Sequence, residues 1–184
     1  YTHIGEGAYV ETERSIRDLL EENGADLSDV EISSAPDPRF DPQALSEDPA
    51  TRITREIYGG YRRNNTARGT YVAHSEYYGA PRKTLVYEDP GNHENQFIYL
   101  QGPWTNGIEQ LRHARETQEY EDYIALRFFA TSVNAVISPE GGAPFDVRVT
   151  LDGGPLEPGQ AGADIMFDAD GNSYVLVDEA RMYD

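Results

Sequence analysis

The clearest alternation of hydrophobic and polar positions lies between residues 122 and 155. Over 145–151 every second residue is apolar, and this period of two predicts a β-strand with one buried face and one solvated face. Residues 124–128 alternate in the same way, but Phe129 then places an aromatic ring on the polar face. We therefore expect a loop or the N-terminal segment to cover Phe129, and this stretch to supply the central strand of a β-sandwich.

Short runs rich in Tyr, Thr and Val, separated by glycine and proline turns, fill the chain after Thr51. Many short strands at close spacing are typical of an all-β jelly-roll β-sandwich, in which each sheet hides its apolar face against the other. The predicted strands span residues 70–74, 84–87, 96–101, 123–129, 133–138, 145–151, 163–167, 174–177 and 181–183.

A helical period precedes these strands. From Glu11 the apolar positions fall on one helix face, and Asn23-Gly24 is a stop signal. A lone helix of about 12 residues is marginal in water, so this one needs a surface to pack on. Residues 24–50 carry four prolines in an acidic, serine-containing run and are predicted to be a linker. The sequence thus divides into residues 1–23, the Pro-rich linker, and a β domain over 51–184.

Charge limits the partners of the chain. Its 33 acidic and 15 basic residues give a net charge of −18, a field that repels nucleic acid and anionic lipid. No apolar run approaches the roughly 20 residues that span a bilayer, so no membrane contact is expected. The chain has no cysteine, which excludes dithiol chemistry and thiolate metal sites from these residues. It starts at Tyr1 rather than at methionine, which indicates a fragment or a processed product.

Several segments carry a resemblance to a known family. The first 20 residues resemble the last strand and closing helix of a thioredoxin-like (AhpC/TSA, redoxin) domain. The rest resembles the C-terminal, carbohydrate-binding-module-like β-sandwich that follows such domains in DipZ-type cytochrome c biogenesis proteins. The segments that carry this second resemblance are Glu56–Tyr61, Tyr99–Trp104, Ile124–Ile137, Val149–Pro155 and Glu179–Tyr183.

The resemblance implies a jelly roll attached to a thiol–disulfide oxidoreductase whose Cys-x-x-Cys motif lies upstream, so no catalytic residue carries over. We expect a non-catalytic accessory binding or scaffolding module, with the upstream thioredoxin-like domain of the same protein as a partner and a glycan or a polypeptide client as a ligand. The alternatives are a purely structural interdomain or dimerisation module and a jelly-roll carbohydrate-active enzyme. The resemblance implies an extracytoplasmic or membrane-tethered parent, while the residues leave the cytoplasm open.

Aromatic residues supply the candidate ligand contacts. Exposed aromatic planes stack against the apolar faces of sugars, but aromatic residues in strands also fill cores and form cross-strand pairs. Both interpretations stay open for each residue. The candidates are Trp104, which is the only tryptophan, together with Tyr77, Tyr78, Tyr120, Tyr123 and Arg127.

A weak calcium motif lies near the C-terminus. Asp168, Asp170 and Asn172 begin like an EF-hand loop, and Glu179 occupies its twelfth position. Ser173 stands where that loop needs glycine, and residues 174–177 are predicted to be a strand, so a hairpin turn fits better. No other metal or cofactor is expected.

Two further patterns are weak signals of a modification site and of a catalytic site. Asn64-Asn65-Thr66 matches the glycosylation sequon, a match that is common by chance. A glycosidase needs two carboxylates with tuned pKa values, and nothing in the spacing of the acids selects a pair. The nearest to a cluster are Glu109, Glu116, Glu119 and Asp122.

Overall fold

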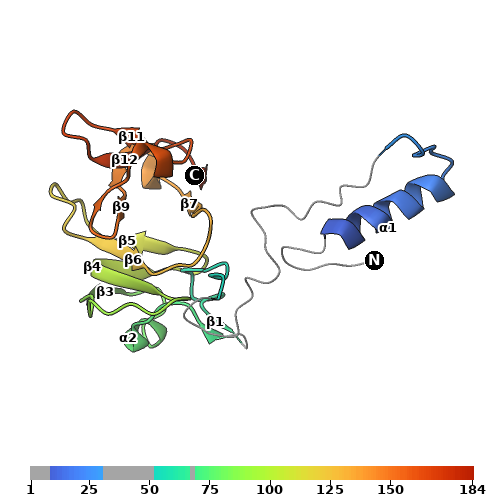
Figure 1. Ribbon diagram of the computed structural model, residues 1–184. Coiled ribbons are helices and arrows are strands. Elements are labelled where there is room, and N and C mark those ends of the chain that lie inside the picture. The colour runs from blue at the N-terminus through green and yellow to red at the C-terminus, as the bar shows by residue number, and fades with distance from the viewer. Residues whose placement is uncertain (1–8, 31–51, 67–68) are drawn as a thin grey trace. The chain divides into compact units, whose positions relative to one another are not determined.

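The computed structural model describes residues 9–30, 52–66 and 69–184, and the chain divides into two units, residues 1–53 and residues 54–184. The first unit contains helix α1, Tyr9–Glu22 (Figure 1). The amide of Gly24 donates to the Glu21 carbonyl and the amide of Ala25 donates to the Leu20 carbonyl, with Gly24 at φ +87°. This is the Schellman stop that a glycine permits, so the predicted helix and its end are confirmed. The predicted linker lies mostly outside the described residues.

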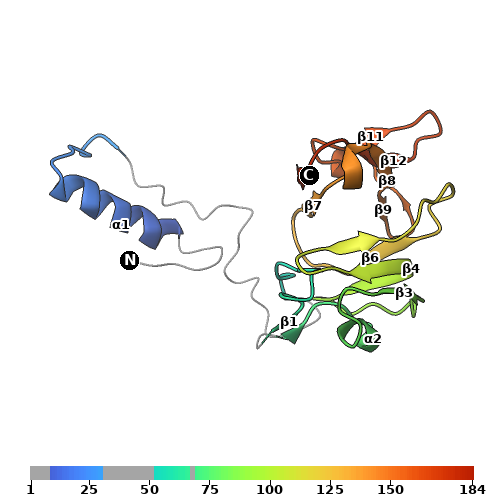
Figure 2. The ribbon, with the colours of Figure 1, turned by 180° about the vertical axis from the view of Figure 1, so that it is seen from behind.

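The second unit is mostly β-structure (Figures 1 and 2). Its one α-helical turn is α2, Ser75–Tyr78, and 3₁₀ turns form at Glu140–Gly142 and Pro158–Gln160. The strands are β1 (Asn65–Thr66), β2 (Gly69–Thr70), β3 (Thr84–Tyr87), β4 (Ile98–Asn106), β5 (Leu111–His113), β6 (Tyr123–Leu126), β7 (Ala135–Ile137), β8 (Phe145–Arg148), β9 (Thr150–Leu151), β10 (Gly154–Pro155), β11 (Met166–Phe167), β12 (Ser173–Val177) and β13 (Arg181–Tyr183).

Strand β4 is the centre of the largest sheet. Its second half pairs with β3 and with β5, and its first half pairs with β6, all antiparallel. The prediction that residues 122–155 supply the central strand is therefore wrong. Phe129 is 43% exposed, because its backbone pairs with Thr54 at the margin of the sheet and leaves its ring uncovered. The sequence of β4 hides its role, since Gly102 and Pro103 interrupt its apolar pattern.

The strands that follow β6 form small antiparallel sheets. Strand β12 lies between β11 and β8, β13 pairs with β7, and β9 pairs with β10. In Figures 1 and 2 these strands lie above the sheet of β3 to β6, and α2 lies below it. The guanidinium of Arg148 on β8 lies 4.3 Å from the ring centroid of Tyr120, which precedes β6, so the two groups of strands meet there.

Two hydrophobic clusters stabilise the second unit. One is built on α2, β3 and β4 and contains Val72, Tyr77, Tyr87, Leu100 and Trp104. The other is built on β12 and β13 and contains Val175, Val177 and Tyr183. The predicted all-β character is confirmed as several small antiparallel sheets, while the jelly-roll sandwich stays a prediction. Within the described ranges, no helix has the length and apolar character that crossing a membrane requires.

Candidate functional site

An open pocket of about 440 Å³ lies beside β4. Tyr78, Phe97 and Tyr99 give it aromatic walls, and Ser75 and Glu94 add a hydroxyl and a carboxylate. Thr70, Val72 and Ala73 complete the lining. Mixed aromatic and polar linings also occur in sites for small organic ligands, where rings cover the apolar faces of a ligand and polar groups orient it.

The hydroxyl of Tyr78 is fully used inside the protein. It donates to the Val72 carbonyl at 2.8 Å and accepts from the Val72 amide at 2.9 Å and the Tyr71 amide at 3.2 Å. These bonds hold the side chain in one orientation. A ligand in the pocket would therefore contact the ring of Tyr78 and not its hydroxyl.

A His–Asp pair, His93 and Asp89, packs against the pocket residue Tyr99. The ring of His93 lies 4.4 Å from the ring of Tyr99, and His93 Nε2 lies 2.7 Å from Asp89 Oδ1. Asp89 also accepts hydrogen bonds from the Gly91 amide and the Tyr123 hydroxyl. Burial raises the pKa of Asp89, but these hydrogen bonds outweigh it and the net pKa lies below the ordinary value. Asp89 is therefore a carboxylate at neutral pH that holds His93 against the ring of Tyr99.

His74, which lies between the pocket residues Ala73 and Ser75 in the sequence, is buried. Its Nε2 accepts a hydrogen bond from the Leu100 amide at 2.9 Å, and its ring lies 5.0 Å from that of Tyr87. Burial lowers the pKa of His74, so the ring is neutral at pH 7 and carries its proton on Nδ1. His74 thereby ties the pocket segment to β4.

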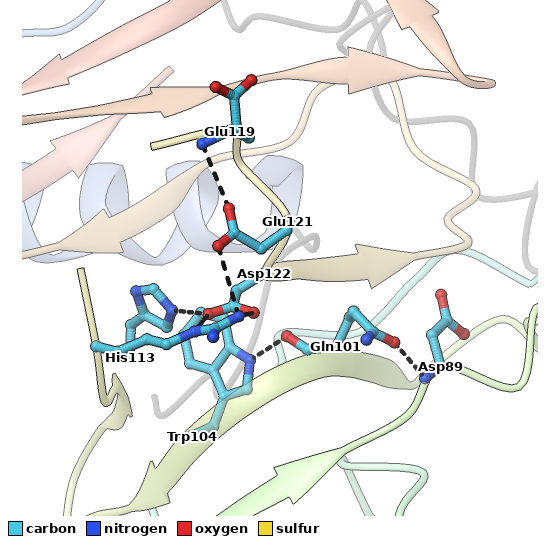
Figure 3. A network of polar contacts seen from close by, with 8 residues as sticks. Asp89, Gln101, Trp104, His113, Glu119, Glu121 and Asp122 are labelled. Carbon is cyan, nitrogen blue, oxygen red and sulfur yellow. Dashed lines mark hydrogen bonds and ion pairs between the residues drawn. The ribbon is translucent and has the colours of Figure 1, made fainter. Parts of the chain in front are cut away.

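A second His–Asp pair lies in a polar network further along β4 (Figure 3). The Asp122 side chain is 1% exposed, and its Oδ2 lies 2.7 Å from His113 Nε2. Arg115 binds both carboxylate oxygens at 2.6 Å, and the ring of His113 lies 4.8 Å from that of Trp104. The Trp104 indole donates to the Gln101 carbonyl, and the Gln101 side chain accepts from the Asp89 amide. The network therefore joins the two His–Asp pairs through β4.

The carboxylate of Asp122 lies directly over a glycine. A Cβ atom at Gly102 would overlap the Asp122 carboxylate, and Gly102 has φ +90°, which side chains rarely adopt. The hydrogen bonds from Arg115 lower the pKa of Asp122, and those from His113 add to the effect against the opposing influence of burial. Asp122 thus closes the base of the loop between β5 and β6, and we call this arrangement of Asp122, Arg115 and His113 the clamp.

The predicted ligand contacts are scattered over the second unit. Trp104 lies in the first hydrophobic cluster, as the core interpretation has it. Tyr77 is 0% exposed, burial raises its pKa, and its hydroxyl donates to the Gly59 carbonyl. Of the six candidates, Tyr78 lines the pocket.

The remaining candidates are surface residues. Tyr120 has φ +56° and stacks on Arg148, and Tyr123 is 43% exposed with its hydroxyl on Asp89. Arg127 is exposed and its backbone bridges to Asn95. Their roles in binding stay predictions. Sequence reasoning missed Phe97, Tyr99 and Glu94, whose only signal is an aromatic pair next to an acid at the start of a strand.

The calcium-like loop forms a hairpin turn between β11 and β12. Asp168 Oδ1 accepts from the amides of Asp170 and Asn172, and Asn172 Nδ2 donates to Asp168 Oδ2. These bonds lower the pKa of Asp168, the hydrogen bond from the Asn172 side chain most of all. In the described part of the chain, no group of three or more acidic, His or Cys side chains is arranged to hold a metal.

The glycosylation sequon is placed where a glycan transferase cannot reach it in the folded protein. Asn64 is 1% exposed, and its Nδ2 donates to the Gly59 carbonyl. Among the predicted acids, Glu109 pairs with Arg62 on the surface, and Asp122 belongs to the clamp.

Comparison with known families identifies a family for the second unit. A family model described as the thioredoxin-like C-terminal domain matches residues 54–184, the same residues as the second unit. No curated protein matches the chain, and no solved structure matches it.

Proposed function

The chain belongs to the thioredoxin-like C-terminal domain family, and from this premise we propose that it is a non-catalytic accessory binding module of a thioredoxin-like protein, with carbohydrate as its ligand. The upstream thioredoxin-like domain of the same protein is its partner in this proposal. The chain has no cysteine, so any thiol–disulfide chemistry of that protein belongs to residues elsewhere.

The pocket lined by Tyr78, Phe97 and Tyr99 is the observation that carries the proposal. A pyranose ring has one apolar face and a rim of hydroxyls. Half-buried rings such as Phe97 and Tyr78 suit the apolar face. Glu94 is exposed and Ser75 lies on the same wall, so a carboxylate and a hydroxyl are available to the sugar hydroxyls. The rings of His93 and His74 lie 4.4 Å and 6.4 Å from the ring of Tyr99 and hold this pocket residue in place.

The pocket supports binding better than hydrolysis. A glycoside hydrolase uses two carboxyl groups about 5 to 10 Å apart across the scissile bond. Glu94 is the one carboxylate among the residues that line this pocket, and an exposed carboxylate suits hydrogen bonding to a ligand. We therefore place the carbohydrate-active enzyme below the binding module.

The jelly-roll sandwich is part of the same proposal. In β12, Ser173, Val175 and Val177 are buried, and Leu176 between them is 40% exposed. This alternation gives β12 one buried and one exposed face, as a strand of a two-layer β-domain requires. The resemblance of the sequence to a carbohydrate-binding module points to the same architecture.

The experiment is a binding titration of the 184-residue chain by NMR with a panel of neutral mono- and oligosaccharides. We expect saturable shifts in residues 70–78 and 94–99, and at least a tenfold loss of affinity in Phe97→Ala. The matched control is Phe167→Ala, because Phe167 is 39% exposed and lies on β11 away from the pocket. If no sugar binds but extended peptides shift the same residues, the carbohydrate ligand is wrong and the module binds polypeptide. If neither binds, the interdomain scaffold is the function.

A further inference from the structure

Strand β3 leaves one edge of the central sheet open. It pairs with β4 through Thr84↔Thr105, Leu85↔Trp104, Val86↔Pro103 and Tyr87↔Gly102, and in the part of the chain that the structure describes no strand pairs with its other edge. Val86 is 79% exposed, so no described segment covers this part of the strand. Unpaired strand edges are templates for the addition of another strand.

A proline identifies which backbone groups point outward. Pro103 has no N–H, so the Val86–Pro103 pair cannot be a hydrogen-bonded pair of the antiparallel ladder. The hydrogen-bonded positions are then Leu85 and Tyr87, in agreement with the bond from the Asn106 amide to the Lys83 carbonyl at 3.3 Å. Thr84 and Val86 therefore direct their N–H and C=O groups away from β4. Their side chains are exposed, while Tyr87 is buried in the core.

The charges at the two ends of β3 are opposite. Arg82 and Lys83 precede the strand, Glu88 follows it, and all three are exposed. When two copies of β3 lie antiparallel with Thr84 opposite Val86, the basic end of each copy lies beside the acidic end of the other. A parallel arrangement places like charges together and is disfavoured. The edge is therefore complementary to itself in the antiparallel orientation.

We propose that the β3 edge is a self-association surface, at which a second copy of this chain adds antiparallel through the backbone groups of Thr84 and Val86. A two-fold axis then relates the two copies, and their sheets form one continuous sheet. This symmetric contact uses the same patch on both partners. It goes beyond ligand binding at the pocket and does not depend on it.

Two features set the strength of the contact. A strand of four residues buries less surface than a stable dimer needs, so the association is weak and transient. The net charge of −18 on each copy opposes association at long range. Since the Debye length is about 30 Å at 0.01 M salt and about 8 Å at 0.15 M, association strengthens when salt is raised from low to physiological concentration.

The first test is hydrogen exchange of the 184-residue chain from micromolar to millimolar concentration. We expect the amides of Thr84 and Val86 to gain protection with concentration, while those of Leu85 and Tyr87, already bonded to β4, stay constant. Sedimentation velocity over the same range gives the fraction of dimer. Concentration-independent exchange at Thr84 and Val86, with a monomer throughout, overturns the proposal.

Variants test the geometry of the contact. Val86→Pro removes an outward N–H and no bond to β4, so it is expected to abolish the dimer while the Trp104 fluorescence keeps its folded value. Arg82→Glu and Glu88→Arg are each expected to weaken the dimer at least tenfold, and the double variant to restore it. Glu116→Arg is the control for Glu88→Arg, because it makes the same charge change on an exposed residue of the β5–β6 loop. A dimer that survives Val86→Pro uses another surface and contradicts the proposal.

Discussion

Asp122 is the residue whose replacement tests the structure most directly. Its carboxylate accepts from His113 Nε2 at 2.7 Å and from two nitrogens of Arg115 at 2.6 Å. In Asp122→Asn the amide keeps one acceptor and points its NH₂ group at a donor. The variant therefore loses charge-assisted bonds and gains a mismatch at a side chain that is 1% exposed.

The magnitude follows from the exposure of the partners. Hydrogen bonds to charged groups contribute about 1.5–3 kcal/mol each when buried. The side chains of His113 and Arg115 are 31% and 49% exposed, so water replaces part of what they lose. We expect Asp122→Asn to lower the free energy of unfolding by about 2 kcal/mol. With a urea m-value of about 1–3 kcal/mol/M, the midpoint falls by about 1 M.

The pH dependence gives the sign of the effect. The pKa of Asp122 is lowered in the folded state, mainly by Arg115, relative to about 3.9 in the unfolded chain. A lowered folded pKa means that the stabilisation is present above the unfolded pKa and is lost as pH falls through the folded pKa. The difference between the wild type and Asp122→Asn is therefore full at neutral pH and shrinks below about pH 4.

The assay is urea unfolding followed by the fluorescence of Trp104, which stacks on His113 and is the only tryptophan. Glu121→Gln is the matched control, because Glu121 contacts the same Arg115 at 3.6 Å but is 48% exposed. Exposed ion pairs contribute about 0–1 kcal/mol, so the control midpoint stays near that of the wild type. Equal midpoints for Asp122→Asn and the wild type at pH 7, or a gap that is unchanged in acid, would refute the role of the clamp.

Four further changes have definite outcomes. Gly102→Ala is expected to destabilise at least as much as Asp122→Asn in the same urea assay, because its Cβ would overlap the carboxylate and its φ is +90°; a smaller effect would show that the clamp yields freely. Gly24→Ala, at φ +87° with open space around it, should cost about 1 kcal/mol of helix stability, measured as lost ellipticity at 222 nm. Tyr77→Phe leaves the Gly59 carbonyl with one donor fewer and should lower the unfolding free energy by about 1 kcal/mol, with no change in the spectrum of the native state. Asn64 should stay unmodified when the purified, folded chain is incubated with an enzyme that glycosylates the sequon, while the urea-unfolded chain gains one glycan that Asn64→Gln removes; equal modification of the folded chain would contradict its burial.

Local signals in the sequence predicted local structure well. Strands β3 and β13 have the predicted bounds, and helix α1 ends where Asn23-Gly24 predicts. These succeeded because strand-forming residues, turn residues and the left-handed glycine act over a few residues. The hairpin at Asp168–Asn172 belongs to the same class, since its hydrogen bonds lie within five residues.

Long-range pairing defeated the same reasoning. Strand β4 became central because β3, β5 and β6 all pair with it, and no pattern within Ile98–Asn106 announces its partners. Phe129 was expected to be covered because its strand was expected to be central. The clamp depends on Gly102, Arg115 and Asp122 meeting in space, and sequence spacing does not say that a glycine makes room for a carboxylate 20 residues later.

The clamp also makes the positions of β5 and β6 independent of the length of the loop between them. Arg115 and Asp122 join the two ends of the loop, so the six residues between them begin and end at a fixed distance from each other. Closing a longer flexible loop costs only about 0.6 kcal/mol for each doubling of its length. Apart from Tyr120, which contacts Arg148, the segment from Glu116 to Glu121 is thus free to change in length and sequence while β5 and β6 keep their register on β4. The sequence of this loop can therefore change to bind a ligand while the sheet that carries it keeps its structure.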